Sequence, residues 1–427
     1  MEHPKMTGFA PLTSREDCLR ADAADTLAPF RERFSLPEGI IYLDGNSLGA
    51  LPKAAAERAR DVIEREWGTD LIASWNTNDW FDLPVRIGAK LAKLVGGESG
   101  ACVATDTTSI NVFKALGAAL EIQRELHPER RVIVSERENF PTDLYMVEGM
   151  IEFLDRGYEL RLIDDELAAE QAIGDDTAVV LLTQVNYRSG RQWNLLDVTE
   201  LAHERGALII WDLCHSVGAV PIALDAAGAD FAVGCTYKYL NGGPGSPAFI
   251  WVAERHVNRA RQPLSGWWGH KRPFEMAVSF EPVDGARRFL TGTQPIISLA
   301  TMEVGLDIAL EVDEQALREK SLALTSLFIE LVESRIPGDA LTLITPRDAA
   351  ERGSHVSFVH PEGFSVMKAL IARGVIGDYR EPGVLRFGVT PLYLGYADIW
   401  DAVEALRLVL ETEEWKAPEF QVRGAVT

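Results

Sequence analysis

The stretch Ala207-Leu208-Ile209-Ile210-Trp211 is an apolar run of strand length that ends at Asp212. Other short apolar runs lie before and after it, at residues 132–134, 178–182, 231–233 and 248–252. Runs of this kind are typical of strands buried on both faces, and stretches with a helical pattern separate them. The alternation predicts an α/β protein whose mainly parallel sheet is covered by helices.

The pattern changes after about residue 300. A long helical pattern precedes two strand-like runs, at residues 355–359 and 384–387, which together predict a smaller α+β domain. We expect an N-terminal segment (1–65) that packs with the small domain, a large domain (66–300) and a C-terminal small domain (301–427). Pro52 begins a further helical pattern whose apolar side chains form one stripe, Ala55, Ala59, Val62, Ile63 and Trp67.

The composition limits the classes of partner. The chain has 427 residues, and 64 acidic against 42 basic side chains give a net charge of −22, which repels nucleic acid and anionic lipid. The four cysteines show neither a CxxC pair nor metal-ligand spacing with histidine. The first residues carry no apolar signal segment, and nowhere do 18 apolar residues run together. We therefore expect a cytoplasmic protein without a metal, nucleic-acid or membrane partner.

Two residues just past predicted strands suggest a cofactor site. Asp212 and Lys238 each follow an apolar run, and open parallel sheets bind ligands at the carboxyl ends of their strands. A lysine amine condenses with a pyridine aldehyde, while a carboxylate keeps the ring nitrogen protonated. Alternatively, Asp212 caps a helix and Lys238 is a solvated loop lysine. Their joint placement, followed by the glycine-rich loop 241–245, favours the cofactor interpretation.

A phosphate group needs its own contacts. Residues 105–109, Thr-Asp-Thr-Thr-Ser, precede a helical pattern, so hydroxyls gather where helix amides point outward. An ordinary N-cap without a ligand explains the same residues. The loop after Lys238 lacks the Gly-Lys-Ser/Thr of a Walker A motif, which argues against a nucleotide triphosphatase.

Three further features have two interpretations each. Phe140 lies at the same predicted sheet edge and either stacks on a planar ring or belongs to the core. Arg386 interrupts an apolar run, so it binds either a substrate carboxylate or an internal acidic partner. Trp267-Trp268 and the turn 291–294 can close a site or form a subunit contact. Alternatively, they pack in the hydrophobic core.

Four segments, taken in order, resemble the kynureninase family of fold-type I pyridoxal 5′-phosphate enzymes. They are residues 42–49 (YLDGNSLG), 139–143 (NFPTD), 237–243 (YKYLNGG) and 386–393 (RFGVTPLY), so the resemblance covers most of the chain. It implies a fold-type I large domain with a seven-stranded sheet. It also implies a homodimer with active sites at the subunit interface.

The resemblance implies roles for individual residues. Lys238 forms the Schiff base with pyridoxal phosphate, Asp212 pairs with the pyridine nitrogen, and Tyr237 is a candidate acid for proton transfer. The other implied cofactor contacts are Thr108, Ser109, Phe140, Pro141, Thr142, Asp143, Thr183, His215, Tyr237, Trp267 and Thr293. The implied substrate contacts are Arg386, which receives the α-carboxylate, together with Trp75 and Asn46.

The implied reaction is hydrolysis of L-kynurenine to anthranilate and L-alanine, in tryptophan catabolism and NAD biosynthesis, with 3-hydroxykynurenine as a further substrate. A second interpretation is another fold-type I enzyme, either a cysteine desulfurase or a class V aminotransferase. A desulfurase should carry His directly before its lysine, where this chain has Tyr237. A third interpretation is a non-catalytic protein of the same fold, although Lys238 and Arg386 are both present.

Overall fold

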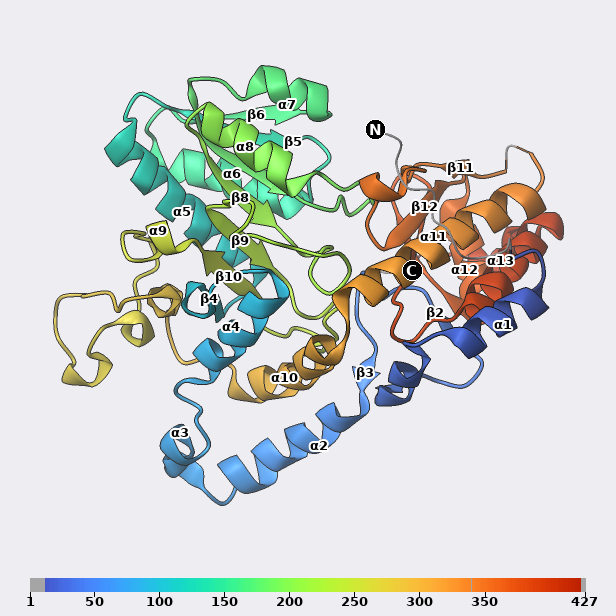
Figure 1. Ribbon diagram of the computed structural model, residues 1–427, viewed down its shortest axis with the longest axis horizontal. Coiled ribbons are helices and arrows are strands. Elements are labelled where there is room, and N and C mark those ends of the chain that lie inside the picture. The colour runs from blue at the N-terminus through green and yellow to red at the C-terminus, as the bar shows by residue number, and fades with distance from the viewer. Residues whose placement is uncertain (1–11, 339, 424–427) are drawn as a thin grey trace.

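A computed structural model describes residues 12–338 and 340–423. The chain forms two lobes, one built around a large sheet and one built around a small sheet, with α10 (Ile296–Glu311) and α11 (Glu314–Arg335) running from the first to the second (Figure 1). The division into segments 1–65, 66–300 and 301–427 stays a prediction.

The large lobe contains a seven-stranded sheet in the order β4-β10-β9-β8-β7-β5-β6. Its strands are β4 (Cys102–Ala104), β5 (Val132–Glu136), β6 (Glu159–Ile163), β7 (Thr177–Thr183), β8 (Leu208–Asp212), β9 (Phe231–Gly234) and β10 (Phe249–Val252). Every neighbouring pair from β9 to β6 is parallel, whereas β10 is antiparallel to both β9 and β4. The predicted fold-type I architecture, with a mainly parallel seven-stranded sheet, is confirmed.

Helices cover both faces of this sheet, which explains why its central strands are apolar throughout. Ile209 and Trp211 face a core shared with α4 and α10, whereas Ile210 faces a core shared with α5 and α6. Each central strand therefore buries both sets of alternating side chains. The helices of this lobe are α3 (Ser74–Thr77), α4 (Leu83–Leu94), α5 (Thr108–Leu126), α6 (Pro141–Leu154), α7 (Glu166–Ala172), α8 (Leu195–Glu204) and α9 (Glu254–Val257).

The small lobe contains an antiparallel sheet in the order β11-β12-β15-β14. Its elements are β11 (Thr342–Leu343), β12 (His355–Val359), β14 (Asp378–Arg380), β15 (Val384–Gly388), α12 (Gly363–Ala372) and α13 (Tyr396–Glu411). The N-terminal helix α1 (Arg15–Ala24) lies against α13 (Figure 1), where Arg15 pairs with Asp401 at 2.7 Å. The short strands β2 (Ile41–Tyr42) and β13 (Val375–Ile376) pair in parallel, while β1 (Phe34–Ser35) and β3 (Leu51–Pro52) pair antiparallel.

The helix predicted after Pro52 is α2 (Lys53–Asp61), and it packs on α10 of the large lobe. The predicted single apolar stripe is wrong beyond Val62: Ile63 is 45% exposed and Trp67 is 58% exposed. The chain continues from α2 as a π-helix, Val62–Trp67, whose wider turns rotate the later side chains away from the stripe.

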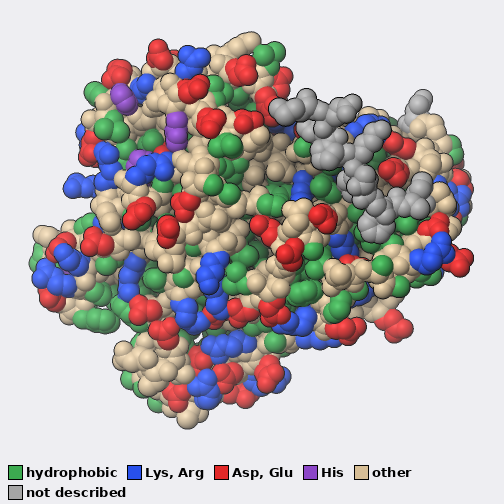
Figure 2. Space-filling model, in the orientation of Figure 1, with side chains coloured by type: hydrophobic (Ala, Val, Ile, Leu, Met, Phe, Trp, Pro, Cys, Tyr) green, Lys and Arg blue, Asp and Glu red, His purple; other side chains and the backbone are tan. Residues whose placement is uncertain are grey.

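On the face drawn in Figure 2, acidic and basic side chains are interspersed, and no continuous basic patch is seen. Within residues 12–338 and 340–423, no helix combines the length and the apolar character needed to cross a membrane.

Candidate active site

A pocket of about 240 Å³ lies at the carboxyl edge of the large sheet. Asp212 is the last residue of β8, and Lys238 lies in the segment that follows the neighbouring strand β9. Most of the predicted cofactor residues line this one pocket: Thr108, Ser109, Phe140, Thr142, Asp143, Thr183, Asp212, His215, Tyr237 and Lys238. Pro141, the first residue of α6, does not line it.

Two hydrogen bonds hold the Asp212 carboxylate in place. The Cys214 backbone N–H donates to one oxygen at 2.7 Å, and the Thr183 hydroxyl donates to the other at 3.2 Å. Burial and the neighbouring Asp212 raise the pKa of Asp143 well above its usual value, which favours the neutral form of Asp143. Asp212, with its two hydrogen-bond donors, is the carboxylate that suits a protonated ring nitrogen.

The Lys238 amine lies 2.9 Å from Nε2 of His215. Burial, and then the charge of Lys238, lowers the pKa of His215 well below its usual value, so its neutral imidazole can accept a hydrogen bond from the amine. Burial and the nearby Cys235 raise the pKa of Tyr237, whose phenol therefore keeps its proton. The pocket thus combines an amine with a phenolic proton donor.

The start of α5 forms another wall of the pocket. Thr107 caps this helix by accepting a hydrogen bond from the Ile110 backbone N–H at 3.4 Å, and Thr107, Thr108 and Ser109 all line the pocket. Amides and hydroxyls at the N-terminus of a long helix suit a phosphate. Phe140 is 42% exposed on another wall and is available to a planar ring. The donor set therefore fits pyridoxal phosphate, as predicted.

Arg386 lies on β15 of the small lobe, and its side chain is 2% exposed. Of the two partners expected for Arg386, the structure shows the internal acidic one. Nε and Nη2 of Arg386 both donate to the carboxylate of Asp378. Nη1 donates to the backbone carbonyl of Tyr187 at 2.5 Å, and Tyr187 also lines the Lys238 pocket. Asn46 is fully buried, and its side-chain amide has no hydrogen-bond partner among the described residues. The predicted substrate residues Arg386 and Asn46 therefore do not line the pocket, and Arg386 is joined to it through Tyr187.

Three predicted residues lie apart from the pocket of the same chain. Trp75 packs against Trp80 and Trp268, with ring centroids 5.5 and 5.3 Å apart. Trp267 is 41% exposed, and Thr293 lines a different, apolar cavity of about 800 Å³. The described chain alone does not bring these three side chains to Lys238.

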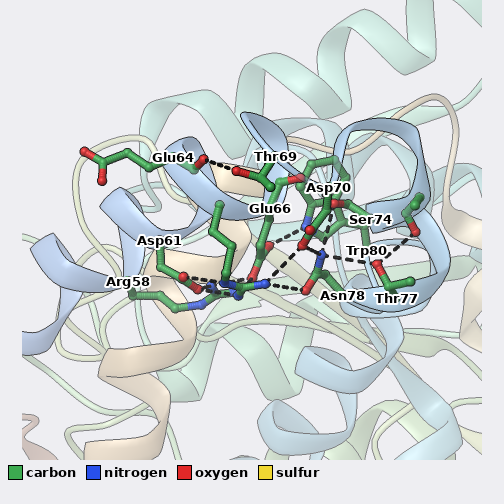
Figure 3. Close-up of polar contacts among 12 residues, drawn as sticks. Arg58, Asp61, Glu64, Glu66, Thr69, Asp70, Ser74, Thr77, Asn78 and Trp80 are labelled. Carbon is green, nitrogen blue, oxygen red and sulfur yellow. Dashed lines mark hydrogen bonds and ion pairs between the residues drawn. The ribbon is translucent and has the colours of Figure 1, made fainter.

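A buried polar cluster fixes the segment that carries Trp75 (Figure 3). The Glu66 carboxylate accepts hydrogen bonds from Trp80 Nε1 at 2.6 Å and from Arg58 at 2.6 Å, while the Ser74 hydroxyl donates to the Glu66 backbone carbonyl at 2.5 Å. The indole on which Trp75 packs is therefore held by the end of the π-helix.

Several further residues around the site were not predicted from the sequence. Tyr187, Cys214 and Ser246 line the pocket, while Ser47 and Asp378 contact Arg386. Ser47 lies within the segment 42–49, and Cys214 lies two residues after Asp212, so their positions in the sequence already pointed to the site. Tyr187 and Asp378 lie in ordinary sequence contexts.

The chain is 59% identical over 416 residues to a kynureninase of Burkholderia pseudomallei (strain 1106a), a match that covers 97% of this chain and 100% of that protein. A kynureninase of Pseudomonas fluorescens is 58% identical with the same coverage. The chain belongs to the kynureninase family. A family model described as the kynureninase C-terminal domain also matches residues 317–406.

Solved structures show that this kynureninase-family chain shares its fold with other enzymes. A cysteine desulfurase of Thermococcus onnurineus has a TM-score of 0.75 at 17% identity, covering 90% of this chain and 98% of that one. A C-DES variant with glycine covalently linked to its PLP cofactor has a TM-score of 0.76 at 13% identity, covering 88% and 98%. At such low identity the likeness concerns the fold alone, and the kynureninases are the relatives that share the sequence.

Proposed function

We propose that the protein hydrolyses L-kynurenine to anthranilate and L-alanine with pyridoxal 5′-phosphate as its cofactor. The observation that carries the proposal is the pocket that unites Lys238, Asp212 and the α5 N-terminus in a chain 59% identical to a kynureninase over its full length. When bound, pyridoxal phosphate supplies an aldehyde for the substrate amine and a protonated ring that stores the electron pair released at Cα.

The residues of the chain then have separate tasks. Arg386 binds the substrate α-carboxylate, and the Lys238 amine removes the proton from Cα. The Tyr237 phenol, protonated because burial raises its pKa, donates a proton during cleavage of the Cβ–Cγ bond. Asp212 holds the proton of the ring nitrogen. Phosphate contacts come from Thr108, Ser109 and Tyr237, and the ring is flanked by Phe140, Thr142, Asp143, Thr183 and His215.

The reaction can be tested by incubating the purified holoenzyme with L-kynurenine in the absence of any keto acid. Anthranilate fluorescence should rise, and a Lys238→Ala variant should abolish it. An aminotransferase would need pyruvate, a desulfurase would release sulfide from cysteine, and a non-catalytic protein would show none of these activities. Any of those three results in place of anthranilate would overturn the proposal.

A second copy of the chain should complete the active site. Trp75, Trp267 and Thr293 lie away from the Lys238 pocket of their own chain, and Trp267 is partly exposed. In a homodimer with active sites at the subunit interface, these three side chains reach the partner's pocket, where Trp267 and Thr293 contact the cofactor and Trp75 the substrate.

Subunit complementation tests this arrangement. Chains carrying Lys238→Ala and chains carrying Trp267→Ala should each be impaired alone, because every site then lacks one of the two residues. Each mixed dimer contains one intact site out of two, so it should regain up to about half of the activity of a wild-type dimer. Mixed dimers that stay as inactive as the parents would show that both residues act within one subunit.

The apolar indole of Trp75 favours plain L-kynurenine over 3-hydroxykynurenine, so kcat/KM should be higher for the former. The physiological setting that we propose is cytoplasmic tryptophan catabolism, whose products feed NAD biosynthesis.

A further inference from the structure

The main partner of the Arg386 guanidinium is Asp378, which belongs to no sequence motif. Asp378 lies on β14, directly opposite Arg386 of β15 in the antiparallel register. Nε of Arg386 donates to one carboxylate oxygen at 2.6 Å, and Nη2 donates to the other. The side chains are 2% and 6% exposed, so this paired geometry is buried. Paired contacts of this kind fix the plane of a guanidinium as well as its position.

The remaining contacts leave the guanidinium little freedom. Nη2 also donates to the Ser47 hydroxyl at 3.0 Å, and Nη1 donates to the Tyr187 carbonyl at 2.5 Å. Ser47 in turn donates to Asp378 at 2.6 Å. Four of the five N–H groups of Arg386 therefore have protein acceptors. The end of the guanidinium that bears Nη1, and with it the fifth N–H, lies beside Tyr187, which lines the Lys238 pocket.

A second arginine shares the same carboxylate. Arg380, also on β14, lies 2.8 Å from Asp378, and its side chain is 38% exposed. An aspartate paired with Arg386 alone would cancel the charge that a substrate carboxylate needs. Two guanidinium groups against the one paired carboxylate leave a net positive charge.

Below about pH 7 the other ionisable groups around Asp378 leave that balance in place. Burial and the charge of Asp378 raise the pKa of Asp44 to about 7, so Asp44 is largely neutral below that pH. Burial raises the pKa of Tyr42, and burial lowers the pKa of His355 to about 3, so both side chains are uncharged.

We propose that Asp378 and Arg380 are positioning residues for the substrate carboxylate: Asp378 aligns the guanidinium of Arg386, and Arg380 offsets the negative charge of Asp378. The inference rests on the proposed function of Arg386 and extends it to residues that do not touch the substrate. It predicts that losing either residue weakens recognition of the carboxylate while the chemistry at Cα continues.

The test compares steady-state constants of the holoenzyme and its variants. Asp378→Asn keeps the shape of the side chain and removes its charge, while Arg380→Met removes the second cation and Arg380→Lys restores it. KM for L-kynurenine should rise about 10- to 100-fold in Asp378→Asn and Arg380→Met, while kcat falls much less. Arg380→Lys should recover most of the loss. Asp401→Asn, which breaks an exposed ion pair of the same lobe, should behave as wild type.

Inhibition by two small ligands separates positioning from general damage. L-Alanine carries the carboxylate, and ortho-aminoacetophenone carries the aryl ketone without it. The inhibition constant of L-alanine should rise with KM in both variants, and that of ortho-aminoacetophenone should not change. Equal weakening of both ligands would mean that the site is distorted as a whole, and the positioning role would be wrong.

Arg386→Met distinguishes this inference from the proposed function. If Arg386→Met leaves KM and the alanine inhibition constant unchanged, Arg386 does not receive the carboxylate and the proposed site fails. If Arg386→Met raises both but Asp378→Asn and Arg380→Met do not, only the positioning role fails.

Discussion

The buried carboxylate of Asp230 holds the active-site strands β8 and β9 in register. Asp230 directly precedes β9, and its side chain is 1% exposed. One oxygen accepts from the Ile209 backbone N–H of β8 and lies 2.8 Å from Nε2 of His203. The other lies 2.8 Å from Nε2 of His256 and 2.6 Å from Arg255. Asp230 therefore ties together the amino ends of the two strands whose carboxyl ends carry Asp212 and Lys238.

Asp230→Ala should lower the free energy of unfolding by about 3 kcal/mol. The Ile209 N–H and the buried His256 would each lose an acceptor, at about 1–2 kcal/mol apiece, whereas Arg255 and His203 can turn to solvent. For a lobe of this size that loss corresponds to a decrease in Tm of about 6–12 °C. Activity at 25 °C should stay near wild type, because Asp230 lies at the opposite edge of the sheet from the pocket.

The effect of Asp230 should also depend on pH in a defined direction. Burial acts to raise the pKa of Asp230, but hydrogen bonds from His203 and His256 and the charge of Arg255 outweigh it and hold the pKa below its usual value. A lowered pKa contributes stability above the unfolded-state pKa of about 4, and this contribution disappears as the pH falls below it. The difference between wild type and Asp230→Ala should therefore be full at pH 7 and shrink below about pH 4.

Urea and thermal unfolding, followed by circular dichroism at several pH values, measure these quantities. The matched control is Asp164→Ala, which removes an exposed ion pair with Arg137 and should cost less than about 1 kcal/mol. An equal loss of stability in the two variants would contradict the predicted role of Asp230. A loss of activity in folded Asp230→Ala protein would contradict it as well.

Three further predictions concern the site and its support. Tyr237→Phe should lower kcat about 10²- to 10⁴-fold with normal cofactor absorbance, and wild-type turnover would remove Tyr237 from the mechanism. Burial and Asp378 raise the pKa of Asp44 to about 7, so the stability linked to the neutral form is lost as the pH rises through 7. Asp44→Asn should thus resist urea better than wild type at pH 8.5 and lose that advantage towards pH 4; a difference independent of pH would contradict this. Glu66→Ala should lower the free energy of unfolding by about 3 kcal/mol and alter the fluorescence of Trp80, since a buried acceptor is lost; unchanged urea midpoints would contradict this.

The parts of the fold that could be predicted are those that local pattern determines. The central strand β8 is apolar throughout because helices cover both of its faces, so the sequence alone reveals it. The edge strand β6 is partly exposed and carries Glu159 and Arg161, which hides it from the same argument. The π-helix after α2 could not be predicted, because one extra residue per turn leaves no mark on composition.

The residues of the candidate site were likewise predictable only where a local pattern places them. Asp212 and Lys238 were predictable because each follows a recognisable strand. Asp378 was not, because its partnership with Arg386 depends on the register of two strands in a different sheet. Trp267 was identified by resemblance, because the local pattern around it is also typical of core packing.

The antiparallel strand β10 is the last strand of the large sheet to be synthesised. Among the described residues, β4 pairs in the sheet only with β10, which inserts between β4 and β9. The α5 N-terminus follows β4, whereas Lys238 precedes β10. A nascent chain that has not yet released Val252 from the ribosome can already pack α5 on β7, β8 and β9, but β4 still lacks its partner strand. We therefore expect the start of α5 to be fixed in its final place only after this strand emerges, when most of the large lobe has already been translated.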